Sequence, residues 1–402
     1  MRSSLLRFAV AGVLACALLG GSTSLAYAAL SSWFTTWAAP TRDPGATSST
    51  FPAGTTIREP VFATISGDSV RVKFSNAYGT STLTVGPLSI GIRSSGSSVM
   101  PGTLMPLTFG GKSTFDIPPH GLALSDPVSL AVPALTDVVV SIYLPNGSGE
   151  SAGYPGANKT IYVGTGDQTL SNDFVQTSTS GNGVFLGAVE VRSTTGVGVV
   201  AAVGDSITQG VGSTGENNRW SDRLAARIET ATAPPLGVLG LGIAGNQLLG
   251  GALTNPAALA RFDRDVLGMA GLTHVIMADG INDFGSTVSN PSLPPNPEDV
   301  EYGLRQLVAR AHARGVKVIG TTMGPAWGFR GYEAIDSKRL AYNSWLKTVG
   351  VTILDGVVDF DAVLNDPNNP SHMLPQYLTD GIHPNNAGHQ AMADAFNLSL
   401  FH

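Results

Sequence analysis

The sequence contains a single cysteine among its 402 residues, Cys16, which lies in an N-terminal segment that we expect to be removed. Without cysteine, the remaining chain can form no disulfide, use no thiolate nucleophile and offer no sulfur ligand to a metal. Its stability must therefore come from a packed core, and any nucleophile must be of another type.

Charged residues are also scarce, at 13% of the chain, and the formal net charge is -6 with no run of basic residues. Proteins that bind nucleic acids or anionic lipid surfaces depend on clustered Lys and Arg. We therefore expect no nucleic-acid partner. The sequence also lacks H-x-H and H-E-x-x-H motifs and carboxylate clusters, so we predict neither a metal nor another cofactor.

No hydrophobic run is long enough to cross a membrane. The run Phe8–Leu19 follows Arg2 and Arg7 and precedes an A-x-A sequence at Ala26–Ala28. This order is typical of a secretory signal peptide, whereas a spanning helix needs about 20 apolar residues. We predict that residues 1–28 are a signal peptide and that the mature protein is secreted or periplasmic, without stable membrane insertion. A membrane anchor is the alternative interpretation.

The chain is too long for one typical domain, and residues 29–195 show no segment of helical periodicity. Short apolar and alternating runs are separated by turns, and the chain holds 49 glycines and 25 prolines. This pattern favours an antiparallel β-sandwich or jelly-roll domain, followed by a linker near 193–196. The clearest predicted strands are Val61–Ile65, Ser69–Phe74, Leu83–Ile92, Val138–Leu144, Thr160–Val163 and Val184–Val191.

Residues 196–402 change character, because short apolar runs now alternate with segments of helical spacing. The best predicted helix starts at Asn296 and Pro297 and stops at Gly315 after Arg314. Alternation of this kind predicts a parallel sheet with helices on both faces. The predicted strands are Val199–Val203, Leu236–Ile243, His274–Ala278, Val316–Gly320 and Val351–Leu354, and the other helices are Asn218–Thr230, Glu333–Leu346 and Asn386–Phe396.

Polar and glycine-rich sequences follow the strands of this second half. Ser206 comes after the first strand, Gly242–Asn246 after the second, Gly280–Asp283 after the third, and Thr379–Pro384 well after the last. The carboxyl ends of parallel strands meet at one edge of a sheet, where ligands bind. Acyl transfer needs a nucleophile, a base, a group that orients the base, and donors for an oxyanion. All four are available in these loops.

At these residues the chain closely resembles the SGNH (GDSL-type) hydrolase family. The resemblance is carried by Gly204–Thr208, by Gly245, by Asn282 in G-x-N-D, and by Asp380 and His383 in D-x-x-H. It implies a three-layer α/β/α domain with a flavodoxin-like parallel sheet. It also implies that Ser206 is the nucleophile, that His383 is the base held by Asp380, and that an oxyanion hole is formed by Ser206 N–H, Gly245 N–H and the Asn282 amide.

Physical chemistry favours the same assignment. Asp380 lies three residues before His383, so its carboxylate can fold back onto the imidazole and leave Nε2 to accept a serine proton. Asp359 and Asp361 could in principle replace Asp380, but neither has this short separation. A glycine at 245 would allow its backbone to approach an oxyanion closely.

Other chemically suggestive residues have simpler interpretations. Ser151 lies in a G-x-S-x-G sequence at 149–153, but that motif needs a strand before it and a helix after it, and Tyr154–Gly156 follows instead. We expect Asp205 and Asp283 to brace their turns. His372 could line the site, whereas surface or core positions are expected for His274, His312 and His389.

Specificity should come from the loops at the same edge. Trp327, Phe329 and Tyr332 lie in one loop, where they could bind substrate or pack beneath it. A β-sandwich before an SGNH domain resembles some bacterial carbohydrate esterases. We therefore expect a serine esterase acting on short acyl esters, such as acetyl groups of a small molecule or polysaccharide. The alternatives are a lipid or aryl-ester hydrolase, and a glycan-binding protein with a vestigial esterase site.

Overall fold

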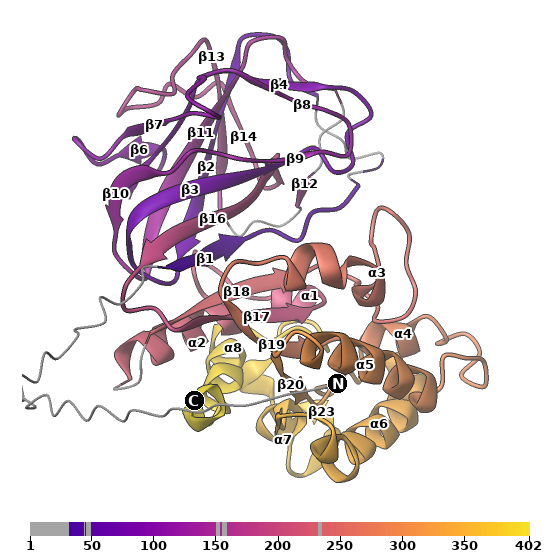
Figure 1. Ribbon diagram of the computed structural model, residues 1–402. Helices are drawn as coiled ribbons and strands as arrows, with labels where there is room; N and C mark the ends of the chain where they lie inside the picture. Colours follow the sequence, from indigo (N-terminus) through magenta and orange to yellow (C-terminus); the bar gives the residue numbers. More distant parts are fainter. Residues whose placement is uncertain (1–31, 44, 46–49, 150–152, 155–158, 232–234) are drawn as a thin grey trace, which may run out of the picture. The chain divides into compact units, whose positions relative to one another are not determined.

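The computed structural model describes residues 32–402, except residue 44 and residues 46–49, 150–152, 155–158 and 232–234 (Figure 1). The predicted signal peptide and Ser151 lie outside the described residues. The described residues form one compact unit. None of the described helices is long and apolar enough to cross a membrane.

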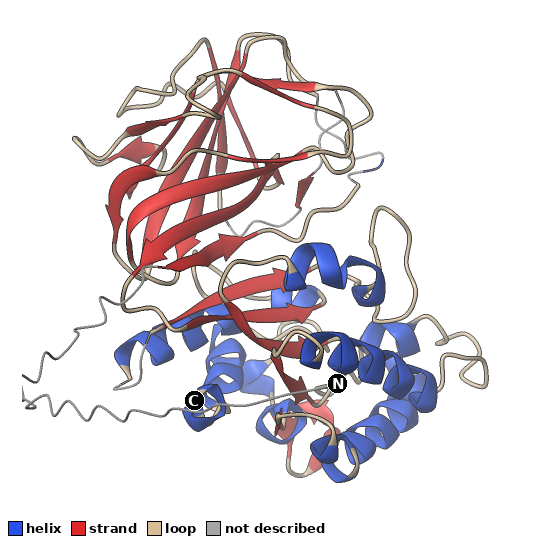
Figure 2. Cartoon of the chain, viewed as in Figure 1, coloured by secondary structure: helices blue, strands red, loops and turns tan. Residues whose placement is uncertain are grey.

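The N-terminal half is built from antiparallel strands, which are drawn in red in Figure 2. One sheet has the order β1-β16-β3-β10, with β9 paired to β3, and a second has the order β14-β13-β2-β11-β5-β6, with β7 paired to β5. Their bounds are β1 Ser32–Ala38, β2 Thr55–Ala63, β3 Gly67–Ser75, β5 Leu88–Ser95, β6 Ser98–Val99, β7 Met105–Leu107, β9 Leu122–Leu124, β10 Val128–Val132, β11 Thr136–Leu144, β13 Ile161–Thr165, β14 Ser178–Ser180 and β16 Leu186–Ser193. Two short pairs join β4 Leu83–Val85 to β8 Phe115–Ile117 and β12 Gly153–Tyr154 to β15 Gly183–Val184.

Apolar side chains from both antiparallel sheets enter one core. Val70, Val72 and Phe74 alternate along β3 and are fully buried, as period-two spacing requires. Strand β11 contributes Val138, Val140 and Ile142 from the second sheet to the same core. The antiparallel β half predicted from the sequence is therefore confirmed.

The second half contains the predicted parallel sheet. Its strands are β17 Gly198–Gly204, β18 Leu236–Gly242, β19 Leu272–Ala278, β20 Lys317–Thr321 and β21 Gly356–Val358. They lie in the order β18-β17-β19-β20-β21. Counted along the chain this is 2-1-3-4-5, the flavodoxin-like order, whose ligands bind at the carboxyl ends of the first and third strands.

The alternating side chains of β17 face two different cores. Val199, Ala201 and Val203 join the core that includes α5, whereas Val200 and Ala202 join the one that includes α2 and α8. Helices therefore cover both faces of the sheet. Their bounds are α1 Ser206–Gln209, α2 Trp220–Thr230, α3 Ala258–Phe262, α4 Ile281–Gly285, α5 Pro297–His312, α6 Asp336–Thr348, α7 Phe360–Leu364 and α8 Asn386–Asp394.

One predicted strand is wrong. Residues 350–352 form a 3₁₀ turn directly after α6, and the last parallel strand is β21, which begins at Gly356. The apolar side chain of Leu354 is buried and meets the position where a Cβ on Gly320 would project. Of the predicted strand only Leu354 is buried, so this short segment forms a turn instead of extending the sheet, and its pattern alone does not distinguish these two outcomes.

Candidate active site

The turn after β17 presents Ser206 at the carboxyl edge of the sheet. Asp205 caps helix α1 by accepting a hydrogen bond from the Ile207 N–H at 2.9 Å. Gly210 ends the helix after one turn in the left-handed conformation. Gly204 must be glycine, because a Cβ there would come within 2.4 Å of the Ala278 carbonyl on neighbouring β19. The turn is therefore tightly specified, and it leaves the Ser206 side chain half-buried.

A second turn brings His383 to Ser206. His383 Nε2 lies 2.9 Å from Ser206 Oγ, and His383 Nδ1 lies 2.7 Å from Asp380 Oδ2. The other Asp380 oxygen accepts the His383 backbone N–H at 3.0 Å. Gly381 allows the tight turn with a φ of 104°, which is costly for other residues. Three residues that the sequence assigned to one site thus form a continuous hydrogen-bonded chain.

Burial and ring contacts hold this histidine in place. His383 is only 7% exposed, and the edge of the Phe329 ring meets it at a centroid distance of 5.3 Å. Asp380 is more open, with 45% of its side chain exposed. Partial burial would raise the pKa of Asp380, but hydrogen bonds from His383 outweigh it and hold that pKa below its usual value. Asp380 is therefore ionised at neutral pH beside the imidazole.

Gly245 and Asn282 lie on the loops that follow β18 and β19. Gly245 is exposed and has a φ of 72°. The Asn282 amide donates to the Asn246 carbonyl at 3.0 Å and makes a longer contact of 3.4 Å with Asp205 Oδ2. Its carbonyl oxygen accepts the Tyr332 hydroxyl at 3.1 Å. These bonds tie the Asn282 side chain to the glycine loop on one side and to the aromatic loop on the other.

A buried polar network supports the glycine loop. The Asn246 side chain accepts hydrogen bonds from the guanidinium of Arg261, which is fully buried and also donates to the Leu241 carbonyl. The side chain of Gln209 accepts the Ala244 N–H at 2.5 Å. The position of Gly245 thus depends on α1, through Gln209, and on α3, through Arg261. No local sequence pattern marks these residues.

Three buried aspartates lie beneath the site. Burial raises the pKa of Asp205 to about 7, that of Asp283 to about 6, and that of Asp279 well above its usual value. Asp283 accepts the backbone N–H groups of Leu248 and Leu249 at 2.7 and 2.9 Å. It therefore braces the loop that follows β18, and not only its own turn.

The aromatic loop after β20 contacts the turn that carries His383, and its three rings differ in environment. Trp327 is 41% exposed, and its ring lies 5.3 Å from that of His372. Phe329 contacts His383, while Tyr332 is buried and donates to Asn282. Only Trp327 offers a large open face to a ligand.

Other candidates from the sequence lie elsewhere. Asp359 binds Thr322 and Lys347, and Asp361 pairs with the buried Arg339, so neither carboxylate reaches His383. His312 pairs with Asp355, whereas His274 and His389 are buried in the cores. Among the residues that the structure describes, no group of three or more His, Asp or Glu side chains is arranged to hold a metal ion.

An open groove of about 600 Å³ lies beside the glycine loop. Its apolar lining comes from Leu249, Leu259, Pro294, Pro295 and Tyr302. The groove also includes Gln247, whose side-chain amide donates to the Asn282 backbone carbonyl at 3.3 Å, so the groove adjoins the turn that carries Asn282.

Comparisons with known proteins place this geometry in context. Residues 202–391 match the GDSL-like lipase/acylhydrolase family model. Comparison with curated proteins yields no match. Similar solved structures include a lipolytic protein of the G-D-S-L family from Desulfitobacterium hafniense, with 23% identity over 49% of this chain and 96% of that one and a TM-score of 0.37.

Two further structures have similar coverage. An enzyme described as an alpha/beta hydrolase from the metagenome of Lake Arreo, Spain, is 27% identical over 50% of this chain and 94% of that one, with a TM-score of 0.39. A catalytic variant of an acetylxylan esterase from Geobacillus stearothermophilus is 20% identical over 50% of this chain and 93% of that one, also with a TM-score of 0.39. The match to the family model identifies residues 202–391 as a GDSL-like lipase/acylhydrolase domain and the protein as a carboxylic ester hydrolase.

Proposed function

We propose that the protein is a serine esterase that works through an acyl-enzyme on Ser206. The observation that carries the proposal is the continuous chain from Asp380 through His383 to Ser206, with contacts of 2.7 and 2.9 Å. Both distances are within hydrogen-bond reach, as a nucleophile, its base and the group that orients the base require.

The steps follow from this geometry. Ser206 Oγ attacks the ester carbonyl while His383 Nε2 takes its proton, and ionised Asp380 stabilises the resulting imidazolium through Nδ1–H. The oxyanion is stabilised by the N–H groups of Ser206 and Gly245 and by the Asn282 amide. The tetrahedral intermediate collapses as His383 gives its proton to the departing alcohol. His383 then activates water, which releases the acid and restores Ser206.

We further propose that the preferred substrate carries a short acyl group, such as acetyl, on a carbohydrate. The Trp327 ring packs against that of His372 and is partly exposed, so it is suited to stacking on a sugar ring. Trp327 lies two residues before Phe329 in the chain, and the Phe329 ring contacts His383. A sugar stacked on Trp327 would therefore have its ester near Ser206.

The apolar groove supports a second candidate, a lipid or aryl ester. Its volume of about 600 Å³ would accommodate an acyl chain longer than acetyl, and it adjoins Asn282 through Gln247. Tyr302 lines this groove and is 68% exposed. The two candidates therefore depend on different aromatic residues, Trp327 and Tyr302.

Hydrolysis of p-nitrophenyl acetate and octanoate by the mature protein tests the mechanism. Turnover that disappears in Ser206→Ala, together with labelling of Ser206 by a fluorophosphonate, is the expected result. Asn282→Ala should lower kcat by a factor on the order of 10² to 10³ if its amide is an oxyanion donor. A wild-type protein that binds glycan but neither turns over esters nor takes the label would refute the mechanism and favour a vestigial site.

Two matched variants then separate the substrates. Trp327→Ala should raise KM for acetylated xylan and leave p-nitrophenyl acetate unaffected. Tyr302→Ala should leave the hydrolysis of acetylated xylan and of p-nitrophenyl acetate unaffected. A selective loss of octanoate hydrolysis in Tyr302→Ala would favour the lipid candidate.

The proposed architecture is a signal peptide at 1–28, a β-sandwich of jelly-roll type at 29–195 and an SGNH hydrolase domain at 196–402, in a secreted or periplasmic protein. The common core of the two antiparallel sheets supports the sandwich. The change from antiparallel β16 to parallel β17, between Ser193 and Gly198, supports the boundary. Export can be tested by sequencing the N-terminus of the mature protein, which should begin at Ala29.

A further inference from the structure

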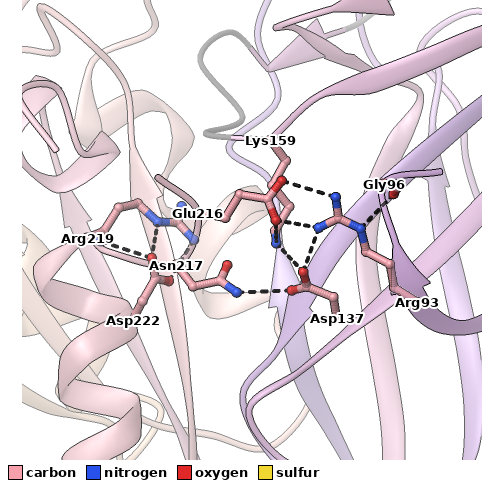
Figure 3. Close-up of polar contacts among 8 residues, drawn as sticks. All are labelled: Arg93, Gly96, Asp137, Lys159, Glu216, Asn217, Arg219 and Asp222. Atoms are coloured by element: carbon pink, nitrogen blue, oxygen red, sulfur yellow. Dashed lines mark hydrogen bonds and ion pairs between the residues drawn. The ribbon is translucent and has the colours of Figure 1, made fainter. Parts of the chain in front are cut away.

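An ionic cluster joins the antiparallel half to the loop that follows the Ser206 helix (Figure 3). Arg93 on β5 and Lys159 supply the two cations, and Asp137 on β11 and Glu216 supply the two carboxylates. Asp137 Oδ2 lies 2.8 Å from Arg93 Nη1 and 2.7 Å from Lys159 Nζ. Glu216 is the only one of the four that comes from the hydrolase half.

Glu216 is held from two sides. Its two carboxylate oxygens accept from the two terminal nitrogens of Arg93, one of them at 3.1 Å, in the bidentate geometry that gives strong, directional pairs. Lys159 Nζ lies 3.2 Å from the same carboxylate. Partial burial would raise the pKa of Glu216, but hydrogen bonding to Arg93 and the charge of Lys159 outweigh it and lower that pKa. Glu216 is therefore ionised at neutral pH.

Burial makes the cluster more sensitive to the loss of one charge than a typical surface ion pair. The side chains of Arg93 and Lys159 are only 10% and 5% exposed, and that of Asp137 is 15% exposed. Two positive and two negative charges balance, so removal of Glu216 would leave an excess positive charge that is largely shielded from water. The next residue, Asn217, reinforces the attachment by donating to Asp137 Oδ1 at 3.1 Å.

The other end of the same loop, residues 210–219, touches the turn that carries His383. A Cβ on Gly212 would lie 2.3 Å from the Pro384 carbonyl oxygen, so the two backbones are in direct contact. Thr214 N–H donates to Asn386 Oδ1 at 2.9 Å, and the Asn386 amide donates back to the Thr214 carbonyl at 3.1 Å. Pro384 directly follows His383 in the chain.

The loop is also continuous with the nucleophile. Val211 N–H donates to the Ser206 carbonyl at 2.9 Å, so the loop leaves directly from the Ser206 helix. Residues 210–219 therefore connect the nucleophile, the histidine turn and the ionic cluster. The loop thus contacts both segments that carry the reacting side chains.

We propose that Glu216 is a positioning residue, through which the antiparallel half fixes the separation of Ser206 and His383. This inference rests on the proposed serine mechanism. Arg93 and Lys159 hold Glu216, Glu216 holds the loop 210–219, and the loop supports the histidine turn at Pro384 and Asn386. Because a misplacement of about 1 Å can cost about 10² in rate, even a small relaxation of this loop would be visible in kcat.

The test uses the mature full chain and the variant Glu216→Gln, which keeps the shape of the side chain but removes its charge. We expect kcat for p-nitrophenyl acetate and the rate constant of fluorophosphonate labelling to fall together by about tenfold, with KM unchanged. Asp68→Asn is the matched control, because it removes the same charge from an exposed ion pair with Arg192 in the antiparallel half. This control should behave as the wild type.

A second variant breaks the opposite end of the linkage. Asn386→Ala removes the three hydrogen bonds between Asn386 and Thr214, all of which are solvent-exposed. It should lower the same two rate constants, and the double variant with Glu216→Gln should be no slower than the slower single variant. Glu216→Asp, which keeps the charge, should recover part of the activity.

The outcomes are distinct. Wild-type labelling rates in both Glu216→Gln and Asn386→Ala would overturn the inference, as would a lowered Tm with an unchanged labelling rate per folded molecule. Independent, multiplicative effects of the two variants would also overturn it. If the fluorophosphonate does not label Ser206 in the wild-type protein, the proposed mechanism itself is refuted.

Discussion

The hydroxyl of Tyr332 should contribute to catalysis through Asn282, without touching the substrate. It donates to the Asn282 side-chain carbonyl at 3.1 Å, and this bond fixes which side of the amide presents its nitrogen to the site. On the nitrogen side, one hydrogen is directed to the Asn246 carbonyl at 3.0 Å. The remaining contact, to Asp205, is long at 3.4 Å, which leaves that hydrogen available to a developing oxyanion.

The expected magnitude follows from the bond that Tyr332→Phe removes. A neutral hydrogen bond contributes about 0.5 to 1.5 kcal/mol net, which corresponds to about a two- to tenfold change in rate. The substitution retains the buried ring and its packing against Phe329. We therefore expect kcat for p-nitrophenyl acetate to fall by this factor with KM little changed, well short of the loss expected for Asn282→Ala.

A double-mutant cycle distinguishes positioning from direct binding. If Tyr332 acts through Asn282, Tyr332→Phe should have no further effect in an Asn282→Ala background. The reasoning would be refuted by equal fold losses of kcat in both backgrounds, or by a wild-type kcat in the single variant. A rise in KM alone would assign Tyr332 to substrate binding instead.

Three further predictions concern the charged groups. Asp380→Asn should lower kcat by up to about 10⁴ in steady-state assays, because it removes the carboxylate that stabilises the imidazolium; a loss below tenfold would contradict that role. Arg339 is fully buried between Asp336 and Asp361, so Arg339→Met should cost about 3 to 5 kcal/mol in urea unfolding, whereas Arg192→Gln in an exposed pair should leave Tm unchanged. Because burial raises the pKa of Asp205 to about 7 and that of Asp283 to about 6, from an ordinary 3.8, the folded state holds these protons more tightly than the unfolded chain. Their contribution to stability is complete below 3.8 and is lost as pH rises from about 4 to 7, so the unfolding free energy should fall more steeply over that range in the wild type than in Asp205→Asn, and equal slopes would contradict it.

The arrangement of the site could be predicted because parallel strands end at a common edge. Ser206 and Asn282 directly follow β17 and β19, so the order of strands alone brings them together. His383 lies far from any strand, and its place was predicted from the D-x-x-H spacing to Asp380. The hydrogen bonds among Asp380, His383 and Ser206 agree with that spacing.

The remaining features depend on pairings that no local pattern records. Strand β1, Ser32–Ala38, was not predicted, because nearly all of it is buried and it shows no alternation; it forms by pairing with β16. The bond between Tyr332 and Asn282 joins residues 50 positions apart, and that between Arg93 and Glu216 joins residues 123 apart. Such contacts follow only from the folded topology.

The buried aspartates also bear on how this site can stabilise a negative charge. Asp205 Oδ2 lies 3.4 Å from the Asn282 amide that we assign to the oxyanion, so an ionised Asp205 would compete for that amide and repel the oxyanion. Burial raises the pKa of Asp205 to about 7, which reduces its charge under mildly acidic conditions. The burial of Asp205 therefore limits the repulsion that an oxyanion would meet from this carboxylate at the same edge of the sheet.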